Sequence, residues 1–303
     1  MTRPIAGDRG QGASPALIKS LAPGGLYIGA EAPFDAAAAV MVGAPLDTTG
    51  TFRPGSRLGP ARIREASYGL ETYSPELDRG LEDLALCDLG DLALPFGAPA
   101  AALAVVRAAA AEISRAGKVP VVLGGEHLLT LGVIEGLLDS GAAADAVVIQ
   151  IDAHADLRPD YEGELLSHAT VMRRVTERVG PDRLVQLGIR SGDRGEMHYA
   201  RANVRHYPDE VLKPLRRVLP ELKGRPLYLS IDIDVLDPAW APGTGTPEPA
   251  GISVHELLQA VRCLGGQQII GIDLVEVAPV LDPTERTAIA AAKVLRELLL
   301  TVF

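Results

Sequence analysis

Short apolar runs alternate with longer amphipathic segments along most of this chain of 303 residues. The apolar runs have the length and composition of buried strands and span residues 39–43, 84–88, 119–125, 146–152, 184–188, 226–234 and 268–273. Helical spacing occurs at 100–118, 167–178, 253–265 and 283–300, with Ser253 as a candidate N-cap and Pro283 as a candidate helix start. This alternation predicts βαβ units, and therefore an α/β fold in which helices cover both faces of a mostly parallel sheet.

Residues 1–37 differ from the rest of the chain because they are rich in Gly, Pro and Ala and show little apolar periodicity. We expect this segment to form an N-terminal arm. Between residues 38 and 303 no Gly/Ser-rich or highly charged linker interrupts the alternation, and no internal repeat is visible. The prediction is a single α/β domain over residues 38–303.

The composition of the chain limits which molecules the protein is expected to bind and where in the cell it is expected to be. A formal net charge of −10 argues against a nucleic-acid-binding protein, and it suits a small cationic substrate, although an acidic surface often serves only solubility. No apolar run approaches the roughly 18 residues of a membrane-spanning helix. The first residues lack the apolar core of a signal peptide, and Cys87 and Cys263 form no CxxC pair. We expect a cytoplasmic protein that binds neither nucleic acid nor membrane.

Acidic and imidazole side chains follow three of the predicted strands. They lie in "GGEH" (124–127), "DAHAD" (152–156) and "SIDID" (230–234), and the candidate ligands are His127, Asp152, His154, Asp156, Asp232 and Asp234. Ligands of doubly wound sheets bind at the carboxyl ends of the strands, so we expect these six side chains to share one rim. Four carboxylates on one rim require cations, and carboxylate with imidazole suits Mn²⁺, Zn²⁺ or Fe²⁺. Six ligands are enough for two ions that share carboxylates.

Three further stretches are candidates for the same rim. His168 begins a predicted helix and is free to move protons near neutral pH, or it is a capping or packing histidine. The Gly/Pro/Thr-rich stretch 238–251, which contains Thr246, suits a pocket wall or an ordinary turn. Glu276 follows a buried strand and could bind a cation such as a guanidinium through paired hydrogen bonds.

These motifs, in this order, resemble the signature set of the ureohydrolases, the arginase and agmatinase family. The stretches that carry the resemblance are "GGEH", "DAHAD" with "SH", "SIDIDVLDP" with "PGTGTP", "EVAP" and the earlier block 43–67. The resemblance extends from about residue 40 to the C-terminus. One departure is Glu126, which stands where many members of the family carry Asp.

The resemblance implies a three-layer α/β/α fold around a parallel sheet of about eight strands, and two Mn²⁺ ions per chain. His127, Asp152, Asp156 and Asp232 would hold one ion, and Asp152, His154, Asp232 and Asp234 the other. A hydroxide between the ions would attack the guanidinium carbon while Asp156 steadies it, Glu276 pairs with the guanidinium and His168 passes a proton to the leaving amine. The family is commonly trimeric or hexameric, so we expect a homotrimer or homohexamer.

The loop "LRPDYEGELLS" (157–167) bears on the choice of guanidine. Asp160, Glu162 and Glu164 would favour a substrate tail that carries only an ammonium group and would repel a carboxylate, unless these acids face solvent. This loop and "PGTGTPEP" resemble the agmatinase branch of the family. Agmatine, which yields putrescine and urea, is therefore the first candidate substrate, followed by 4-guanidinobutyrate and other ω-guanidino acids, and then arginine.

Two other classes of function use similar residues. A two-metal phosphoesterase needs basic side chains or a Gly-rich amide cradle for phosphate, and Arg158 is the one basic residue near the predicted metal loop. A non-catalytic metal-binding protein would be expected to lack a ligand or His168, and none of these residues is missing.

Overall fold

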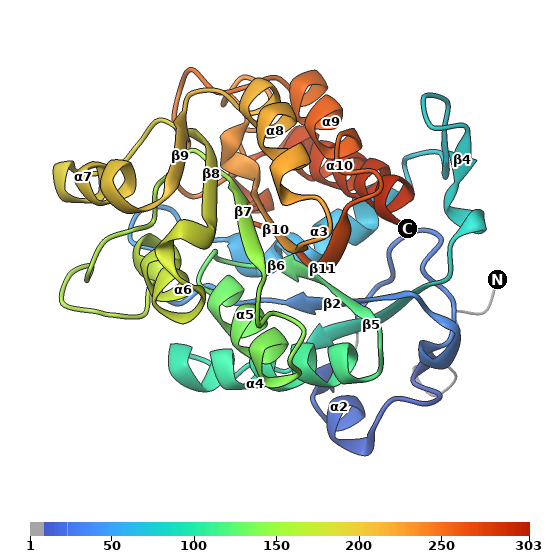
Figure 1. Cartoon of the computed structure of the whole chain (residues 1–303). Helices are drawn as coiled ribbons and strands as arrows, with labels where there is room; N and C mark the ends of the chain where they lie inside the picture. Colours follow the sequence, from blue (N-terminus) through green and yellow to red (C-terminus); the bar gives the residue numbers. More distant parts are fainter. Residues whose placement is uncertain (1–8, 23) are drawn as a thin grey trace.

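A mostly parallel sheet forms the centre of the computed structural model, which describes residues 9–22 and 24–303 (Figure 1). Within these residues the sheet has nine strands in the order β1-β5-β2-β6-β11-β10-β7-β8-β9. The eight strands from β5 to β9 in this order are parallel, and β1 (Leu21–Ala22) pairs antiparallel with β5 at the edge. The prediction of a mostly parallel sheet of about eight strands is confirmed.

Seven of the eight parallel strands coincide with the predicted apolar runs. Their bounds are β2 (Ala39–Ala44), β5 (Leu86–Leu92), β6 (Val119–Gly124), β7 (Val147–Ile151), β8 (Leu184–Ile189), β10 (Pro226–Asp232) and β11 (Gln268–Val275). The eighth, β9 (Arg205–Pro208), was not predicted because its sequence RHYP is polar and ends in proline. A separate hairpin joins β3 (Tyr73–Ser74) to β4 (Arg79–Gly80).

Helices cover both faces of the sheet, as predicted (Figure 1). One face packs against α3 (Gly59–Ser67), α8 (Leu212–Val218), α9 (Val254–Arg262) and α10 (Arg286–Val302). The other face packs against α2 (Pro15–Lys19), α4 (Pro99–Arg115), α5 (Leu129–Asp139) and α6 (Val171–Val179), and α7 (Arg194–Asn203) lies near the β8–β9 edge. Among the described residues no helix combines the length and apolar character needed to cross a membrane.

The two cores follow from the alternation of side chains along each strand. On β7, Val148 belongs to the core beneath α4–α6, whereas Ile149 and Ile151 belong to the core beneath α8–α10. On β10, Tyr228 and Leu229 divide between the same two cores. Successive side chains of a strand point to opposite faces, so a sheet covered on both sides needs continuous apolar runs.

The helix boundaries match the predicted ones in part. Ser253 is the N-cap of α9, where its hydroxyl accepts a hydrogen bond from the Glu256 N–H at 3.1 Å. Pro283 is not a helix start, because the Asp282 carboxylate accepts from the Thr287 N–H at 2.9 Å and holds an irregular turn before α10 begins at Arg286. Helices α2, α3, α5, α7 and α8 were not predicted.

The segment expected to form an N-terminal arm packs on the sheet where it is described. Residues 1–8 and 23 of this segment lie outside the described part of the chain. Leu17 enters one core, and Tyr27 enters the other, where its hydroxyl donates a hydrogen bond to the Ala292 carbonyl at 2.7 Å. The division into an arm and a domain stays a prediction.

A buried ion pair joins α3 to β5. The Arg64 guanidinium is 1% exposed, and its Nε and Nη2 donate to the two oxygens of Asp88 at 2.8 and 2.9 Å. The Asp88 carboxylate also accepts from the Tyr27 N–H at 2.9 Å, and Asp91 pairs with the same guanidinium. Burial removes Arg64 and Asp88 from water, and these contacts compensate for the lost hydration, so the network depends on each member.

Replacing Asp88 with Ala should leave the Arg64 charge short of a partner in the core. We expect Asp88→Ala to lower the free energy of unfolding by about 3–5 kcal/mol, the usual effect of breaking a buried pair. Urea denaturation at pH 7 measures it. The matched control is Asp139→Ala, which removes the exposed pair with Arg107 and should cost about 1 kcal/mol or less. Equal losses from both variants would contradict the buried network.

Candidate metal and active site

Four adjacent strands at the centre of the sheet carry the six predicted metal ligands and Glu276. In the strand order β6-β11-β10-β7, each strand is followed at its carboxyl end by one polar segment of the sequence. His127 follows β6, Glu276 follows β11, the Asp232–Asp234 segment ends β10, and Asp152 follows β7. Parallel strands end at the same edge, so residues spread over 150 positions meet on one rim.

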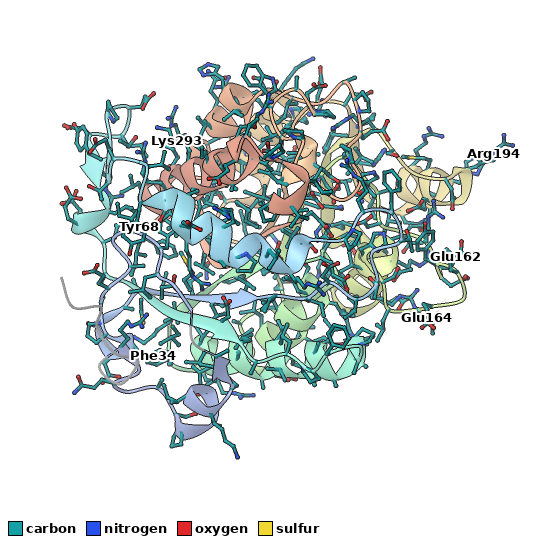
Figure 2. All side chains as sticks on the ribbon, turned by 180° about the vertical axis from the view of Figure 1, so that it is seen from behind. Phe34, Tyr68, Glu162, Glu164, Arg194 and Lys293 are labelled. Atoms are coloured by element: carbon teal, nitrogen blue, oxygen red, sulfur yellow. The ribbon has the colours of Figure 1, made fainter. Side chains whose placement is uncertain are left out.

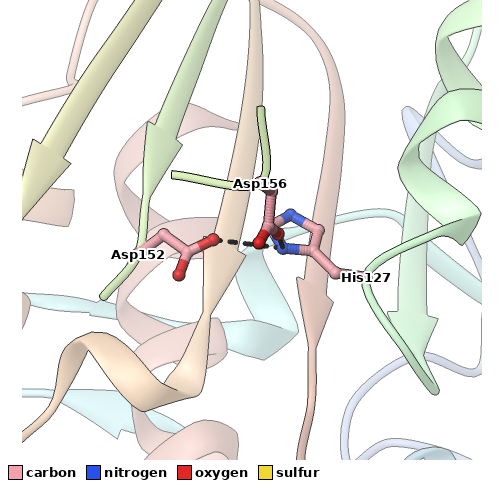
Figure 3. Close-up of side chains that lie close together, drawn as sticks. All are labelled: His127, Asp152 and Asp156. Atoms are coloured by element: carbon pink, nitrogen blue, oxygen red, sulfur yellow. Dashed lines mark ion pairs between the residues drawn. The ribbon is translucent and has the colours of Figure 1, made fainter. Parts of the chain in front are cut away.

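One cluster forms around the buried imidazole of His127, and Figure 3 shows two of its carboxylates pointing at the ring. The Nδ1 atom lies 3.1 Å from Asp152 Oδ2, 3.1 Å from Asp156 Oδ2 and 3.5 Å from Asp232 Oδ2. Although it is buried, this nitrogen makes no hydrogen bond with any described residue. An imidazole lone pair and three converging carboxylates are the donor set of a divalent metal site.

A second cluster shares Asp152 with the first. His154 Nδ1 lies 2.9 Å from Asp234 Oδ2 and 3.8 Å from Asp152 Oδ1. Backbone N–H groups fix both carboxylates, because the His154 N–H donates to Asp152 Oδ1 at 2.6 Å and the Ala153 N–H donates to Asp234 Oδ1 at 3.2 Å. The structure thus brings all six predicted ligands together. Five of them form two groups that could each hold an ion, and Asp232 lies beside the first group.

The electrostatics of the rim favour added positive charge. Burial raises the pKa of Asp156, and the charge of Asp152 raises it further, to about 7. Burial and then the charge of Asp234 raise the pKa of Asp232 well above its usual range. Burial alone would lower the pKa of His127, but the carboxylates of Asp152 and Asp156 raise it well above normal. A cation among these groups would relieve the repulsion between the carboxylates.

Two acidic residues of the rim have backbone conformations that favour glycine. Asp156 has φ of +53° and Glu276 has φ of +66°. Non-glycine residues in the left-handed region cost free energy, and they are frequent at functional sites. In this conformation Glu276 directs Oε1 to the His127 N–H, which donates to it at 2.7 Å.

A cavity of about 390 Å³ opens above the two clusters. Eight of the predicted site residues line it: His127, His154, Asp156, His168, Asp232, Asp234, Thr246 and Glu276. Asp152 lies fully buried behind them, within reach of both histidines. A cavity with two candidate metal clusters at its floor and a carboxylate at its side could support hydrolysis of a cationic substrate.

The three acidic side chains of the loop 157–167 do not reach this cavity. Asp160, Glu162 and Glu164 are exposed and are not among its lining residues, and Figure 2 shows Glu162 and Glu164 at the outer edge of the molecule. The backbones of Tyr161 and Glu164 exchange two hydrogen bonds at 2.9 Å, and Glu162 and Gly163 between them have positive φ, as in a type I′ turn. This tight turn directs Tyr161 to the cavity and the glutamates to solvent.

His168 reaches the cavity from a 3-10 helix, η4 (His168–Thr170), and is held by the early part of the chain. Its N–H donates to Thr49 Oγ1 at 3.0 Å, and its Nδ1 lies 3.4 Å from the same hydroxyl. The Thr49 N–H donates in turn to Glu126 at 2.8 Å, so Glu126 positions the segment that holds His168. Burial and then the charge of His154 lower the pKa of His168 to about 4, which leaves the ring neutral at pH 7.

Several cavity residues were not predicted as site residues. Asp193 lines the cavity and caps α7 by accepting from the Glu196 N–H at 2.9 Å. The sequence DRGE shows this capping box, but a cap does not reveal what the free side of the carboxylate faces. Arg158 also lines the cavity; its Nε donates to Glu196 at 3.1 Å and its guanidinium covers the Tyr161 ring at 4.7 Å.

Comparisons with known proteins agree with this architecture. Residues 37–301 match the sequence profile of the arginase family. The chain is 48% identical over 280 residues to the agmatinases of Bacillus subtilis and Halalkalibacterium halodurans, which covers 91% of this chain and 96% of each relative. It is also similar to the crystal structure of the agmatine ureohydrolase of Thermoplasma volcanium, with a TM-score of 0.83, 30% identity and coverage of 94% and 96%.

Proposed function

This chain belongs to the arginase family, and on that premise we propose that it hydrolyses agmatine to putrescine and urea. The observation that carries the proposal is the position of Glu276, a half-buried carboxylate that lines the same cavity as the two His/Asp clusters. The names of the agmatinase relatives support the choice of agmatine.

The two clusters fit a pair of Mn²⁺ ions. His127 with Asp152, Asp156 and Asp232 would hold one ion, and His154 with Asp152, Asp232 and Asp234 would hold the other. The orphaned Nδ1 of His127 and the crowding of carboxylates around it support this assignment. Bound ions of this kind supply Lewis acidity that makes water a nucleophile at neutral pH.

Glu276 is suited to bind the guanidinium. Burial raises its pKa to about 8, so the ionised carboxylate is stabilised by a cation beside it. The His127 N–H already occupies Oε1 at 2.7 Å, which fixes the direction in which the carboxylate accepts hydrogen bonds. A planar guanidinium that donates to Glu276 would have its carbon held above the metal clusters.

His168 is suited to carry a proton to the leaving amine. Its ring is neutral at pH 7 because burial lowers its pKa, so an imidazolium formed there would release its proton readily. The Thr49 hydroxyl and the Tyr161 ring, whose centroid lies 5.6 Å away, restrict the imidazole at the cavity wall.

Two side chains of opposite charge on the cavity wall, Asp193 and Arg158, could recognise the far end of the substrate. The Asp193 side chain is 46% exposed at the cavity wall and would accept hydrogen bonds from the ammonium of agmatine. Arg158 on the same wall would favour a carboxylate, and for this reason 4-guanidinobutyrate is the second candidate. Because Glu196 already pairs with Arg158 at 3.1 Å, agmatine remains the first.

Urea release by the Mn²⁺-loaded protein tests the substrate. We expect agmatine to be hydrolysed with the highest kcat/KM when agmatine, 4-guanidinobutyrate and arginine are compared at pH 8 under identical metal loading. Preference for 4-guanidinobutyrate would indicate that Arg158 binds the carboxylate at the far end of the substrate. Absence of urea from all three, with two ions bound, would contradict the proposed reaction.

Replacing His168 with Ala tests the proton carrier. The variant should bind two Mn²⁺ ions, measured by elemental analysis, because His168 belongs to neither cluster. Its kcat for agmatine should fall roughly 100- to 10,000-fold, the usual contribution of a general acid–base group. Loss of metal would show that His168 is a ligand instead.

Replacing Asp193 with Asn tests tail recognition against the acidic loop. We expect Asp193→Asn to raise the KM for agmatine roughly tenfold, and to change the KM for 4-guanidinobutyrate less. The double variant Glu162→Gln, Glu164→Gln is the matched control, because both glutamates are exposed away from the cavity. If the double variant alone raises the KM for agmatine, the loop recognises the tail and Asp193 does not.

A further inference from the structure

Three polar side chains form a row across the sheet next to the loop 152–156, which carries three of the proposed ligands. Gln150 on β7, Gln186 on β8 and His206 on β9 are cross-strand partners. Both glutamines are fully buried, and His206 is half-buried at the edge of the sheet. The partners two residues earlier on β7 and β8, Val148 and Leu184, are apolar, so the polar row is a local feature.

The hydrogen bonds along this row all run in one direction, from a donor on His206 toward an acceptor on Asp152. The Gln186 carbonyl oxygen lies 3.1 Å from His206 Nδ1, and because a carbonyl oxygen only accepts, His206 donates from Nδ1. The Gln186 amide then donates to Gln150 Oε1 at 2.7 Å and to the Ala155 carbonyl at 2.7 Å. The Gln150 amide donates to Asp152 Oδ2 at 2.7 Å and to the His154 carbonyl at 3.0 Å.

The hydrogen-bond partners of Gln150 and Gln186 allow only one orientation of each side-chain amide. Turning the Gln186 amide by 180° would place its oxygen against the carbonyl oxygens of Gln150 and Ala155. Turning Gln150 would place its oxygen against the Asp152 carboxylate. Buried polar groups without partners cost free energy, so each amide fixes the next.

Three of the four amide hydrogens end on residues 152–155. They hold the carboxylate of Asp152 and the carbonyls of His154 and Ala155, and the fourth links the two glutamines. We propose that Gln150, Gln186 and His206 are positioning residues that hold the loop 152–156 in its metal-binding conformation. We call this chain of three hydrogen-bonded side chains the relay. His206, which does not line the cavity, is its end farthest from the proposed ligands.

The position of Asp152 explains why the relay would matter for metal affinity. The Oδ2 atom that accepts from Gln150 is the same atom that lies 3.1 Å from Nδ1 of His127. Asp152 also belongs to both clusters, so a rotation of its carboxylate would disturb both. Groups that orient a metal ligand from behind typically change metal affinity 10- to 100-fold when removed.

The inference rests on the metal site of the proposed function, and Mn²⁺ binding tests it without use of the reaction. Free Mn²⁺ is followed by electron paramagnetic resonance while the ion is titrated into the wild type, His206→Leu and His206→Asn. The Asn amide places an N–H near the position of the imidazole Nδ1, whereas Leu removes the donor. His198→Leu, which removes an exposed histidine on α7, is the matched control.

We expect His206→Leu to weaken Mn²⁺ binding roughly tenfold or more, while His206→Asn and His198→Leu stay within about threefold of the wild type. Urea denaturation of the metal-free proteins shows whether His206→Leu is folded. Wild-type affinity in a folded His206→Leu variant, or failure of Asn to restore affinity, would overturn the relay. Absence of Mn²⁺ binding by the wild type would overturn the proposed metal site itself.

A double-mutant cycle tests whether the row acts as a unit. Gln186→Met interrupts the relay at its centre with a side chain of similar size. If His206 acts only through Gln186, adding His206→Leu to Gln186→Met should weaken Mn²⁺ binding no further than Gln186→Met alone. Additive losses would mean that His206 acts by another route, and would contradict the relay.

Discussion

Repulsion among buried carboxylates is the constraint on which the functional edge of this protein depends. Asp152, Asp156, Asp232 and Asp234 lie within a few residues of two strand ends, those of β7 and β10, and all four are buried. Such a group is stable only beside positive charge, and two histidines supply part of it. The same requirement favours the binding of divalent cations among these carboxylates.

The parallel sheet provides the rigidity that this arrangement needs. Asp152 follows Gln150, and Asp232 follows Ser230, by two residues, so each ligand continues the face of the strand that supports it. Ser230 lies 2.8 Å from His127 Nε2 and donates to Asp273 at 2.6 Å. The supporting side chains therefore lie within the sheet, where register leaves them little freedom.

Much of this could be predicted from the sequence, because the signals were local. Buried strands and the residues that follow them are adjacent in the chain, and parallel pairing then brings six ligands to one rim. The surroundings of the cavity depend on turns and on tertiary contacts. The positive φ angles of Glu162 and Gly163 turn an acidic loop outward, and Asp193 gives no sign in the sequence that it faces the cavity. Strand β9 was missed because its four residues, RHYP, are mostly polar, end in proline and show no apolar run.

The strand order also determines when the site can form during synthesis. β11 is the last strand of the chain, yet it lies between β6 and β10 at the centre of the sheet. Until residues 268–275 have left the ribosome, the strands that carry His127 and Asp232 have no common neighbour to align them. The rim is therefore a late product of folding, completed by the same strand that brings Glu276. A nascent chain would expose its acids separately, and metal loading would follow completion of the sheet.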